Sequence, residues 1–169
     1  MRPKQLEDAV NDYAWNTDSE LMHLDATKVL KMPFEEFLVR YADEIDHNSH
    51  NHLRFAIDTT DGKHIGNCTC YNIDTTHQEA EIGILIGDRQ YWDKGYGTSA
   101  VREMIGKVFG EMAFKKIRVR TLSSNIRAQR CFQKCGFTIS GTCAEKDHEF
   151  VIMEKYRGDL PTSAPSAQY

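Results

Sequence analysis

Gly95 and Gly97 lie in a turn between an apolar, strand-like segment and a helix-like segment. Glycine lets the backbone approach a ligand closely, and the first N–H groups of the following helix point outward with the positive end of the helix dipole. Such a turn favours a phosphate or pyrophosphate, although an ordinary turn from strand to helix explains the same glycines equally well. No Gly-Lys-Ser/Thr sequence closes a P-loop, so ATP hydrolysis is unsupported. Ala100 replaces the third glycine of the dinucleotide fingerprint, which makes NAD a weak alternative.

A carboxylate in the strand-like segment 79–86 offers acid–base chemistry. Alternation along a strand places Glu81 on the same face as Gly83 and Leu85. Glu81 could take a proton from an ammonium group, directly or through a water molecule, and so free an amine for attack. A solvated strand residue explains Glu81 as well, and His77 in the preceding loop is a second candidate base.

The chain has five cysteines, and none of them forms a CxxC pair. Cys68 and Cys70 are expected on one face of a strand, and Cys131 and Cys135 on one face of a helix. An odd number at these spacings fits small buried apolar side chains better than a disulfide framework. We therefore predict no metal site. The alternative is a zinc site, in a segment that we interpret as a polar loop, with three histidines as ligands: His47, His50 and His52.

Composition limits the class of protein. The chain has 169 residues, 40% of them hydrophobic, which is enough for one buried core. Its net charge of -4 argues against a general nucleic-acid-binding protein, which needs surplus Lys and Arg to neutralise phosphates. The longest apolar run, 82–86, is far shorter than the roughly 20 residues of a membrane span, and residues 1–8 contain no apolar signal segment. We predict a cytoplasmic protein with no membrane partner, one domain over 1–157 and a disordered tail over 158–169.

The elements that must position these residues change their periodicity twice. Apolar residues spaced three and four apart predict helices from residue 6 to about 45, with a new helix opened by Pro33. A hairpin turn is expected at Asp61–Gly62. One later helix continues the Gly-rich turn to Met112, and another covers 125–135. The predicted strands are 53–58, 63–73, 79–86, 117–121, 137–141 and 149–155, which together indicate an α+β protein with a mixed sheet.

A second motif follows the Gly-rich turn, 30 residues after Gly95. Asn125 and Ala128 form an Asn-x-x-Ala pattern at the start of a helix, and that helix ends at Gly136-Phe137. In this order and at this separation, the two motifs resemble those of the GNAT superfamily of acyl-CoA N-acyltransferases. The resemblance covers roughly residues 40–156.

The resemblance implies an α+β fold with a mixed, mostly antiparallel sheet, helices on both faces, and fourth and fifth strands that splay apart. The sequences that start at Asp12 and Asp18 are similar to the branch with ribosomal-protein alanine and spermidine N-acetyltransferases. The implied co-substrate is acetyl-CoA, with its pyrophosphate on backbone amides of the Gly-rich turn and its pantetheine beside the fourth strand. The implied cofactor-binding residues are Ile84, Leu85, Ile86, Trp92, Asp93, Lys94, Gly95, Tyr96, Gly97, Thr98, Ser99, Asn125, Ala128 and Phe132.

Three positions depart from the family pattern. Trp92 stands where the family has Gln or Arg, so the usual polar side-chain contact is missing while the backbone amides remain. Phe132 stands where many members have a tyrosine that is taken as the general acid, and phenylalanine cannot donate a proton. The chain also begins near Arg2, where the family's first strand would be ending, so that strand is expected to be short or missing.

The implied activity is direct transfer of an acetyl group from acetyl-CoA to a primary amine, without a metal or a covalent acyl-enzyme. The amine would belong to a peptide or protein N-terminus, a polyamine or another small molecule, with Glu81 as the candidate base. The alternative is a non-catalytic acyl-CoA-binding sensor or interaction module, which Phe132 favours, and a homodimer is compatible with either. Acidic residues in the helical part would steer a cationic acceptor, or they form a solvated helix face. These residues are Glu35, Glu36, Asp43, Glu44 and Asp46.

Overall fold

In the described part of the chain, seven strands form one sheet in the order β1-β2-β3-β4-β5-β7-β6. The computed structural model describes residues 1–47 and 51–159. From residue 160 onward the predicted tail lies outside the described residues, as does His50 of the alternative zinc site. The strands are β1 (Arg2–Pro3), β2 (His52–Asp58), β3 (His64–Asp74), β4 (Glu79–Ile86), β5 (Lys116–Leu122), β6 (Thr138–Glu145) and β7 (His148–Tyr156). The α-helices are α1 (Ala9–Asn16), α2 (Ser19–Leu24), α3 (Phe34–Asp46), α4 (Tyr96–Gly106) and α5 (Ile126–Lys134).

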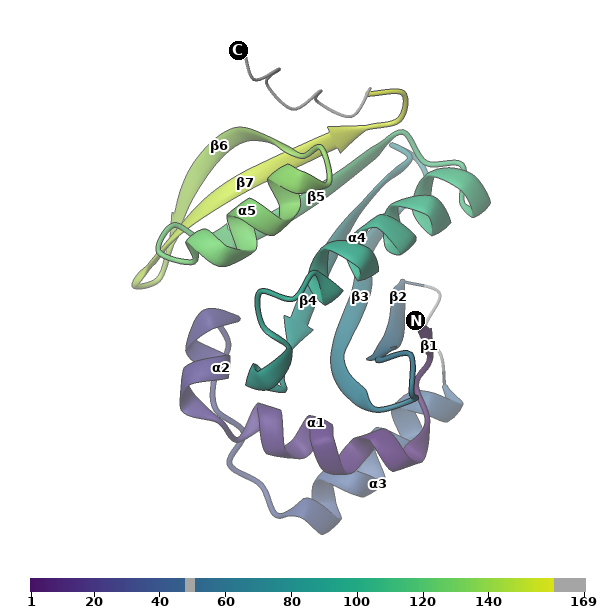
Figure 1. Ribbon diagram of the computed structural model, residues 1–169, viewed down its shortest axis with the longest axis vertical. Coiled ribbons are helices and arrows are strands. Elements are labelled where there is room, and N and C mark those ends of the chain that lie inside the picture. Colours follow the sequence, from purple (N-terminus) through teal and green to yellow (C-terminus); the bar gives the residue numbers. More distant parts are fainter. Residues whose placement is uncertain (48–50, 160–169) are drawn as a thin grey trace.

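The middle of the sheet opens because β4 and β5 pair over only a short stretch. All other neighbouring strands are antiparallel, whereas β4 and β5 run parallel, in register from Glu79 opposite Lys116 to Glu81 opposite Arg118. Beyond this point the strands separate, β4 toward the N-terminal helices and β5 toward the β6–β7 hairpin (Figure 1). The predicted splay of the fourth and fifth strands is confirmed. Among residues 1–47 and 51–159, no strand lies beside the rest of β4 on that side.

Side chains alternate along β4 and so reach two different helical layers. Ile82 is buried in the main core, which also contains Val101 and Met104 of α4. Leu85 packs on the opposite face against a smaller cluster that includes Trp15 of α1. The prediction of helices on both faces of the sheet is therefore confirmed.

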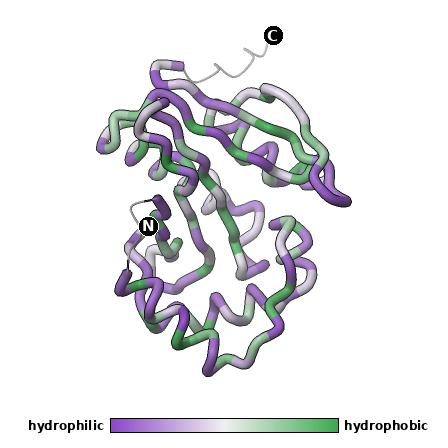
Figure 2. The backbone as a smooth tube through the Cα atoms, turned by 180° about the vertical axis from the view of Figure 1, so that it is seen from behind, coloured by the Kyte–Doolittle hydropathy of each residue, from purple (hydrophilic) through white to green (hydrophobic). Residues whose placement is uncertain are grey.

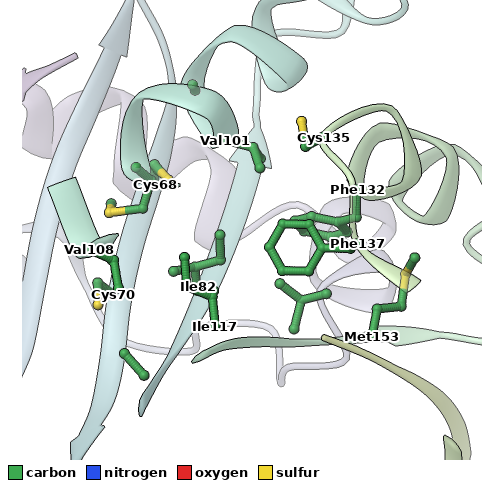
Figure 3. Packing of buried hydrophobic residues seen from close by; sticks show 14 of the residues in the cluster. Cys68, Cys70, Ile82, Val101, Val108, Ile117, Phe132, Cys135, Phe137 and Met153 are labelled. Carbon is green, nitrogen blue, oxygen red and sulfur yellow. The ribbon is translucent and has the colours of Figure 1, made fainter. Parts of the chain in front are cut away.

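The main core joins both halves of the sheet beneath α4 and α5. In Figure 3 the ring of Phe132 lies beside that of Phe137, with ring centroids 5.5 Å apart and an interplanar angle of 67°. Cys68 and Cys70 of β3 are completely buried in the same core, and all five cysteines are free thiols. The β3 cysteines thus act as small apolar side chains, as predicted.

A buried polar network ties the N-terminal segment to α1, α3 and β3. The Lys4 ammonium pairs with Asp12 at 2.7 Å and donates to Asn67 Oδ1 at 2.5 Å. The Tyr41 hydroxyl and the Asn67 amide also donate to Asp12, each at 2.8 Å. Burial lowers the pKa of Lys4, against the opposing effect of Asp12. Because buried charges persist only when paired and hydrogen-bonded, these four side chains depend on one another.

The two later helices begin where the sequence predicts, but one of them ends differently. α4 stops at Gly106 and is followed by a single π-helical turn over Lys107–Glu111, so Met112 lies beyond it. Gly106 and Gly110 are poor helix formers, which weakens the regular α-helix in this segment. The first strand is short, as expected, and pairs with β2 through Arg2 and Pro3.

Candidate functional site

A cleft of about 980 Å³ lies between the N-terminal helices and the diverging strands. Residues of β3 and β4 form part of its lining, among them Tyr71, Gly83 and Ile84. The N-cap of α5 contributes Asn125, the β6–β7 turn contributes Lys146, and the first residue of β7 contributes His148. This turn forms the hydrophilic tip of the molecule in Figure 2. The cleft reaches the part of β4 that has lost its β5 neighbour, so the splay gives access to that strand.

The Gly-rich turn presents free backbone N–H groups at the start of α4. Gly95 has a left-handed φ of +87°, which favours glycine, and a Cβ there would meet no atom within 4 Å. The first helical hydrogen bond of α4 runs from the Ser99 N–H to the Gly95 carbonyl at 2.9 Å. The preceding amides of Tyr96, Gly97 and Thr98 have no acceptor within the helix. With the helix dipole, these amides can hold a phosphate group.

Gly97 connects this turn to the cleft. A Cβ at Gly97 would lie 3.4 Å from Cys131 Sγ, 3.6 Å from Ile84 Cδ1 and 3.9 Å from Ile86 Cγ1, all ordinary van der Waals distances. Ile84 also lines the cleft. An elongated ligand held at the turn can therefore continue along β4 into the cleft. A side chain longer than alanine at position 97 would enter that path.

The cofactor-binding residues predicted from the sequence divide into two groups. Ile84 and Leu85 of β4 and Asn125, Ala128 and Phe132 of α5 line the same cleft. The remaining residues do not line it and surround the Gly-rich turn or its approach. They are Ile86, Trp92, Asp93, Lys94, Gly95, Tyr96, Gly97, Thr98 and Ser99.

Asn125 fixes the start of α5 against α2. Its side-chain oxygen accepts the Ala128 N–H at 3.1 Å as an N-cap, and its amide donates to the Leu24 carbonyl at 3.3 Å. Phe132, two turns further along the helix, is 3% exposed and therefore contributes shape to the cleft wall. The Asn-x-x-Ala pattern therefore connects α5 to the end of α2, two elements that border the cleft.

Glu81 lies outside the main cleft and borders a smaller pocket of about 220 Å³ with Asn72 and Arg118. Its Oε2 atom is buried and accepts no hydrogen bond within the described residues, and Arg120 Nε lies 3.9 Å from it. Burial and the nearby Glu81 carboxylate raise the pKa of Tyr71 to about 12. Tyr71 lies opposite Glu81 in the β3–β4 pairing and also lines the main cleft, so it is the cleft residue that adjoins the Glu81 carboxylate.

Asp25 is a cleft residue that the sequence interpretation missed, because nothing in its local pattern distinguishes it from other acidic residues. It follows α2 directly, next to the Leu24 carbonyl that holds Asn125. Its side chain meets solvent in the cleft, yet the surrounding protein raises its pKa to about 6, against a weak opposing bond from Thr27. Asp25 has no ion-pair partner among the described residues. The other carboxylates of the cleft are all paired, as Asp12–Lys4, Glu44–Arg54 and Glu145–Arg120.

We expect Asp25→Asn to stabilise the free protein at about pH 8 and to leave it unchanged at about pH 3, below the unfolded pKa. The pKa of Asp25 is raised from 3.8 to about 6 in the folded state, so its ionisation opposes folding. The free-energy cost is absent at pH values below the pKa of Asp25 in the unfolded state. It grows as the pH rises toward the pKa in the folded state and is complete above that pKa. Because the side chain still meets solvent, the expected gain is only about 1 kcal/mol, or a few degrees in Tm.

Thermal unfolding of both proteins at the two pH values measures this effect. Asp147→Asn, in the exposed β6–β7 turn, is the control for loss of one negative charge. Equal Tm values for wild type and Asp25→Asn at about pH 8 would contradict the prediction.

The other acid–base candidates lie away from the cleft. His77 is in the exposed turn between β3 and β4, where its Nδ1 lies 2.7 Å from Asp74 Oδ2. Among the acidic residues of α3, Glu44 lines the cleft and the others do not. Glu36 pairs with Arg40 along an exposed helix face, as the solvated-face interpretation expects.

Within residues 1–47 and 51–159, no group of three or more His, Cys, Asp or Glu side chains could hold a metal ion. The helices in this part of the chain are all too short or too polar to cross a membrane.

A comparison with known protein families shows which family this chain matches. Residues 1–138 match the family described as "Acetyltransferase (GNAT) domain", which is most of the chain. The chain belongs to the GNAT family. The resemblance predicted from the two motifs is confirmed, and the match begins at residue 1, before the roughly 40–156 that the motifs indicated.

Curated relatives of this GNAT domain match over a shorter segment. The aminoglycoside N(6')-acetyltransferase type 1 of Klebsiella pneumoniae is 34% identical over 76 residues, which are 45% of this chain and 38% of that protein. A kanamycin resistance protein of Rhizobium radiobacter is 38% identical over 64 residues, which are 38% of this chain and 59% of that protein. The chain thus matches less than two thirds of the length of either relative.

Solved structures resemble this chain over nearly its whole length. Spermidine N-acetyltransferase from Vibrio cholerae, in complex with CoA and spermine, has a TM-score of 0.81 at 20% identity, covering 92% of this chain and 93% of that chain. The aminoglycoside acetyltransferase AAC(6')-Ib, in complex with coenzyme A, has a TM-score of 0.75 at 22% identity, with the same two coverages of 92% and 93%. At such low identity this likeness shows the fold, and it confirms the predicted GNAT-like sheet.

Proposed function

We propose that this GNAT protein is an N-acetyltransferase that moves an acetyl group from acetyl-CoA to a primary amine by direct transfer. The observation that carries the proposal is the continuity of the Gly-rich turn with the cleft through Gly97 and Ile84. A phosphate-binding turn at one end and carboxylates at the other suit a long anionic cofactor and a cationic acceptor. Bound acetyl-CoA would supply the acetyl thioester.

The residues of the turn and the cleft fit that cofactor. The amides of Tyr96, Gly97 and Thr98 are free to bind its pyrophosphate, and the open space at Gly95 admits it. The pantetheine would lie along the unpaired part of β4 and the facing side of α5. The proposed cofactor-binding residues are therefore those predicted from the sequence: 84–86, 92–99, Asn125, Ala128 and Phe132.

Glu81 is the proposed base, and it acts through Tyr71 or a water molecule because it lines the smaller pocket and not the main cleft. Asp25 is the proposed partner of the acceptor's cationic group. An unpaired carboxylate held among protein atoms lowers stability until a cation joins it, so a bound ammonium relieves the cost. Glu81 then takes a proton from a different ammonium group of the acceptor, the one that reacts, and so frees its lone pair for attack.

The acceptor class follows from this charge arrangement. A primary amine is favoured, whether it belongs to a polyamine, an aminoglycoside, another small amine or a peptide or protein N-terminus. The relatives named for aminoglycosides and the solved structure with bound spermine support a small polycationic amine. This acceptor has at least one further positive charge that Asp25 can bind.

A panel of amines tests the proposal. The release of CoA thiol from acetyl-CoA is measured with spermidine, kanamycin, single amino acids and peptides with free N-termini. We expect turnover with at least one polycationic amine. Binding of acetyl-CoA without turnover on any member would instead favour the non-catalytic sensor, and absence of binding would contradict both.

We expect the rate to rise with pH and to show no falling limb from an enzyme acid at about pH 8 to 10. Phe132 has no proton to give, and the pKa of Tyr71, the nearest cleft tyrosine to Glu81, is about 12. Phe132→Tyr should keep cofactor affinity within about twofold, because it adds only a hydroxyl to a packed ring. A pH–rate profile over this range measures the effect. An alkaline limb that does not depend on the acceptor's pKa would reveal an unidentified donor, and Cys131 is the first to test.

The proposal also includes a homodimer of one-domain chains, with the domain over residues 1–157, that works in the cytoplasm. Five free cysteines support a reducing compartment. Light scattering should give about twice the chain mass of 19.4 kDa. A monomeric mass would remove the dimer from the proposal and leave the reaction unaffected.

A further inference from the structure

The guanidinium of Arg127 lies over the indole ring of Trp92. Its guanidinium carbon is 3.4 Å from the ring centroid, which is close stacking contact, whereas that of Arg89 is 5.6 Å away. The Trp92 ring cannot move freely, because its N–H donates to the Ile86 carbonyl at 2.7 Å. Stacking leaves the guanidinium N–H groups in their own plane, directed away from the ring.

The charge of Arg127 has no direct partner in the part of the chain that the structure describes. Arg89 is held by Asp18 and Glu20, with contacts of 2.9 and 2.7 Å. Arg127 makes no hydrogen bond and no ion pair within the described residues, although its side chain is half-buried and burial lowers its pKa. Asp93 acts on it electrostatically without bonding it. A guanidinium that is partly removed from water and keeps all its donors is suited to bind an anion.

The position of Arg127 tells which anion this is. Arg127 and Cys131 are one helical turn apart on the same side of α5. Cys131 Sγ lies 3.6 Å from Thr98 Oγ1 and faces Gly97, in the first turn of α4. Trp92 stands three residues before Gly95 on the approach to that turn. Two contacts therefore place Arg127 near the Gly-rich turn: its own helix α5 packs against that turn through Cys131, and its guanidinium covers Trp92, which precedes the turn.

We propose that Arg127, stacked on Trp92, binds a phosphate group of the cofactor next to the amides of the α4 turn. The inference rests on the proposed function, because it takes CoA as the ligand of that turn. Trp92 fixes the plane of the guanidinium before the ligand arrives, so little side-chain entropy is lost on binding. The phosphate is either the pyrophosphate or the 3′-phosphate, which share the chemistry of recognition.

Calorimetric titration of CoA and of 3′-dephospho-CoA into wild type and Arg127→Gln tests this role. We expect CoA to bind Arg127→Gln roughly 10- to 100-fold more weakly, the range for loss of hydrogen bonds to a charged group. If Arg127 binds the pyrophosphate, both ligands lose affinity by the same factor. If it binds the 3′-phosphate, the variant and wild type bind dephospho-CoA equally. Arg127→Lys, which keeps the charge but not the planar stack, should fall between the two proteins.

Arg130→Gln is the matched control, since Arg130 is an exposed residue of the same helix with the same charge. CoA affinity of Arg127→Gln within about twofold of wild type would overturn the inference. A lower Tm of the free variant, with unchanged affinity, would show that Arg127 only braces Trp92. If wild type itself does not bind CoA, the proposed function is wrong, and the role of Arg127 is wrong with it. Normal CoA binding by both wild type and Arg127→Gln would instead overturn the role of Arg127 alone.

Discussion

Gly97→Phe is expected to abolish the thermal stabilisation that CoA gives the wild-type protein. Ligand at 100 times its Kd stabilises a folded protein by about 2.7 kcal/mol, which is a Tm shift on the order of 5–10 °C for a chain of this size. A Cβ at position 97 lies 3.6 Å from Ile84 Cδ1 and 3.4 Å from Cys131 Sγ, so a phenyl ring attached to it would extend into the path between the turn and the cleft. Differential scanning fluorimetry with and without CoA measures the shift.

Two control variants distinguish a loss of CoA binding at the Gly-rich turn from a general loss of folding. Gly97→Ala adds a Cβ at ordinary contact distances, so it should fold normally and keep most of the CoA shift. Gly106→Phe places the same ring on the same helix where a Cβ meets no atom within 4 Å, and it should keep the full shift. An undiminished shift in a folded Gly97→Phe would rule out this turn as the phosphate site.

Glu81→Gln is expected to lower the acetylation rate by a factor of about 10² to 10⁴, the usual effect of removing a general base. Glutamine keeps the size of the side chain but cannot take a proton, so CoA binding should not change. The rising limb of the pH–rate profile should be flattened as well. Steady-state kinetics with the best amine of the panel, together with a CoA titration, measures all three quantities.

Asp25→Asn is the informative comparison. An acceptor-binding carboxylate should raise KM for the amine with a smaller effect on kcat, and Glu35→Gln, on the exposed face of α3, should change neither. Should Glu81→Gln keep its rate while Asp25→Asn loses kcat, the base would be Asp25, whose pKa of about 6 suits a base that works near neutral pH.

Features that depend on local periodicity could be predicted from the sequence. The strand over 79–86 has the same bounds in the structure, and the hairpin turn is closed by a bond from Gly62 N–H to the Thr59 carbonyl at 3.0 Å. The two motifs also indicated the family and the splayed strands. Strand β6 extends to Glu145, four residues beyond its predicted end, because its pairing partner β7 continues alongside it to His148. The β6 sequence lacks the alternation of apolar and polar residues that would predict this pairing.

Features that depend on distant partners could not be predicted. Asp25 stands out only once Tyr71 and Asn125 are brought around it by the fold. The stacking of Arg127 on Trp92 joins α5 to the turn before α4, and these two segments share no local pattern. The hydrophobic spacing that reveals elements gives no information about which polar side chains remain unpaired in a cleft.

The buried Lys4–Asp12–Tyr41–Asn67 network determines where acceptor preference can change during evolution. All four side chains line the cleft, so they face an acceptor while holding the fold together. Breaking a buried ion pair on one side costs about 3–5 kcal/mol, a large part of the 5–15 kcal/mol that stabilises a typical domain. Asp25 and the β6–β7 turn carry no such constraint, because they belong to connecting loops. New specificities, natural or selected in the laboratory, are therefore expected to arise through these two loops while the network wall persists.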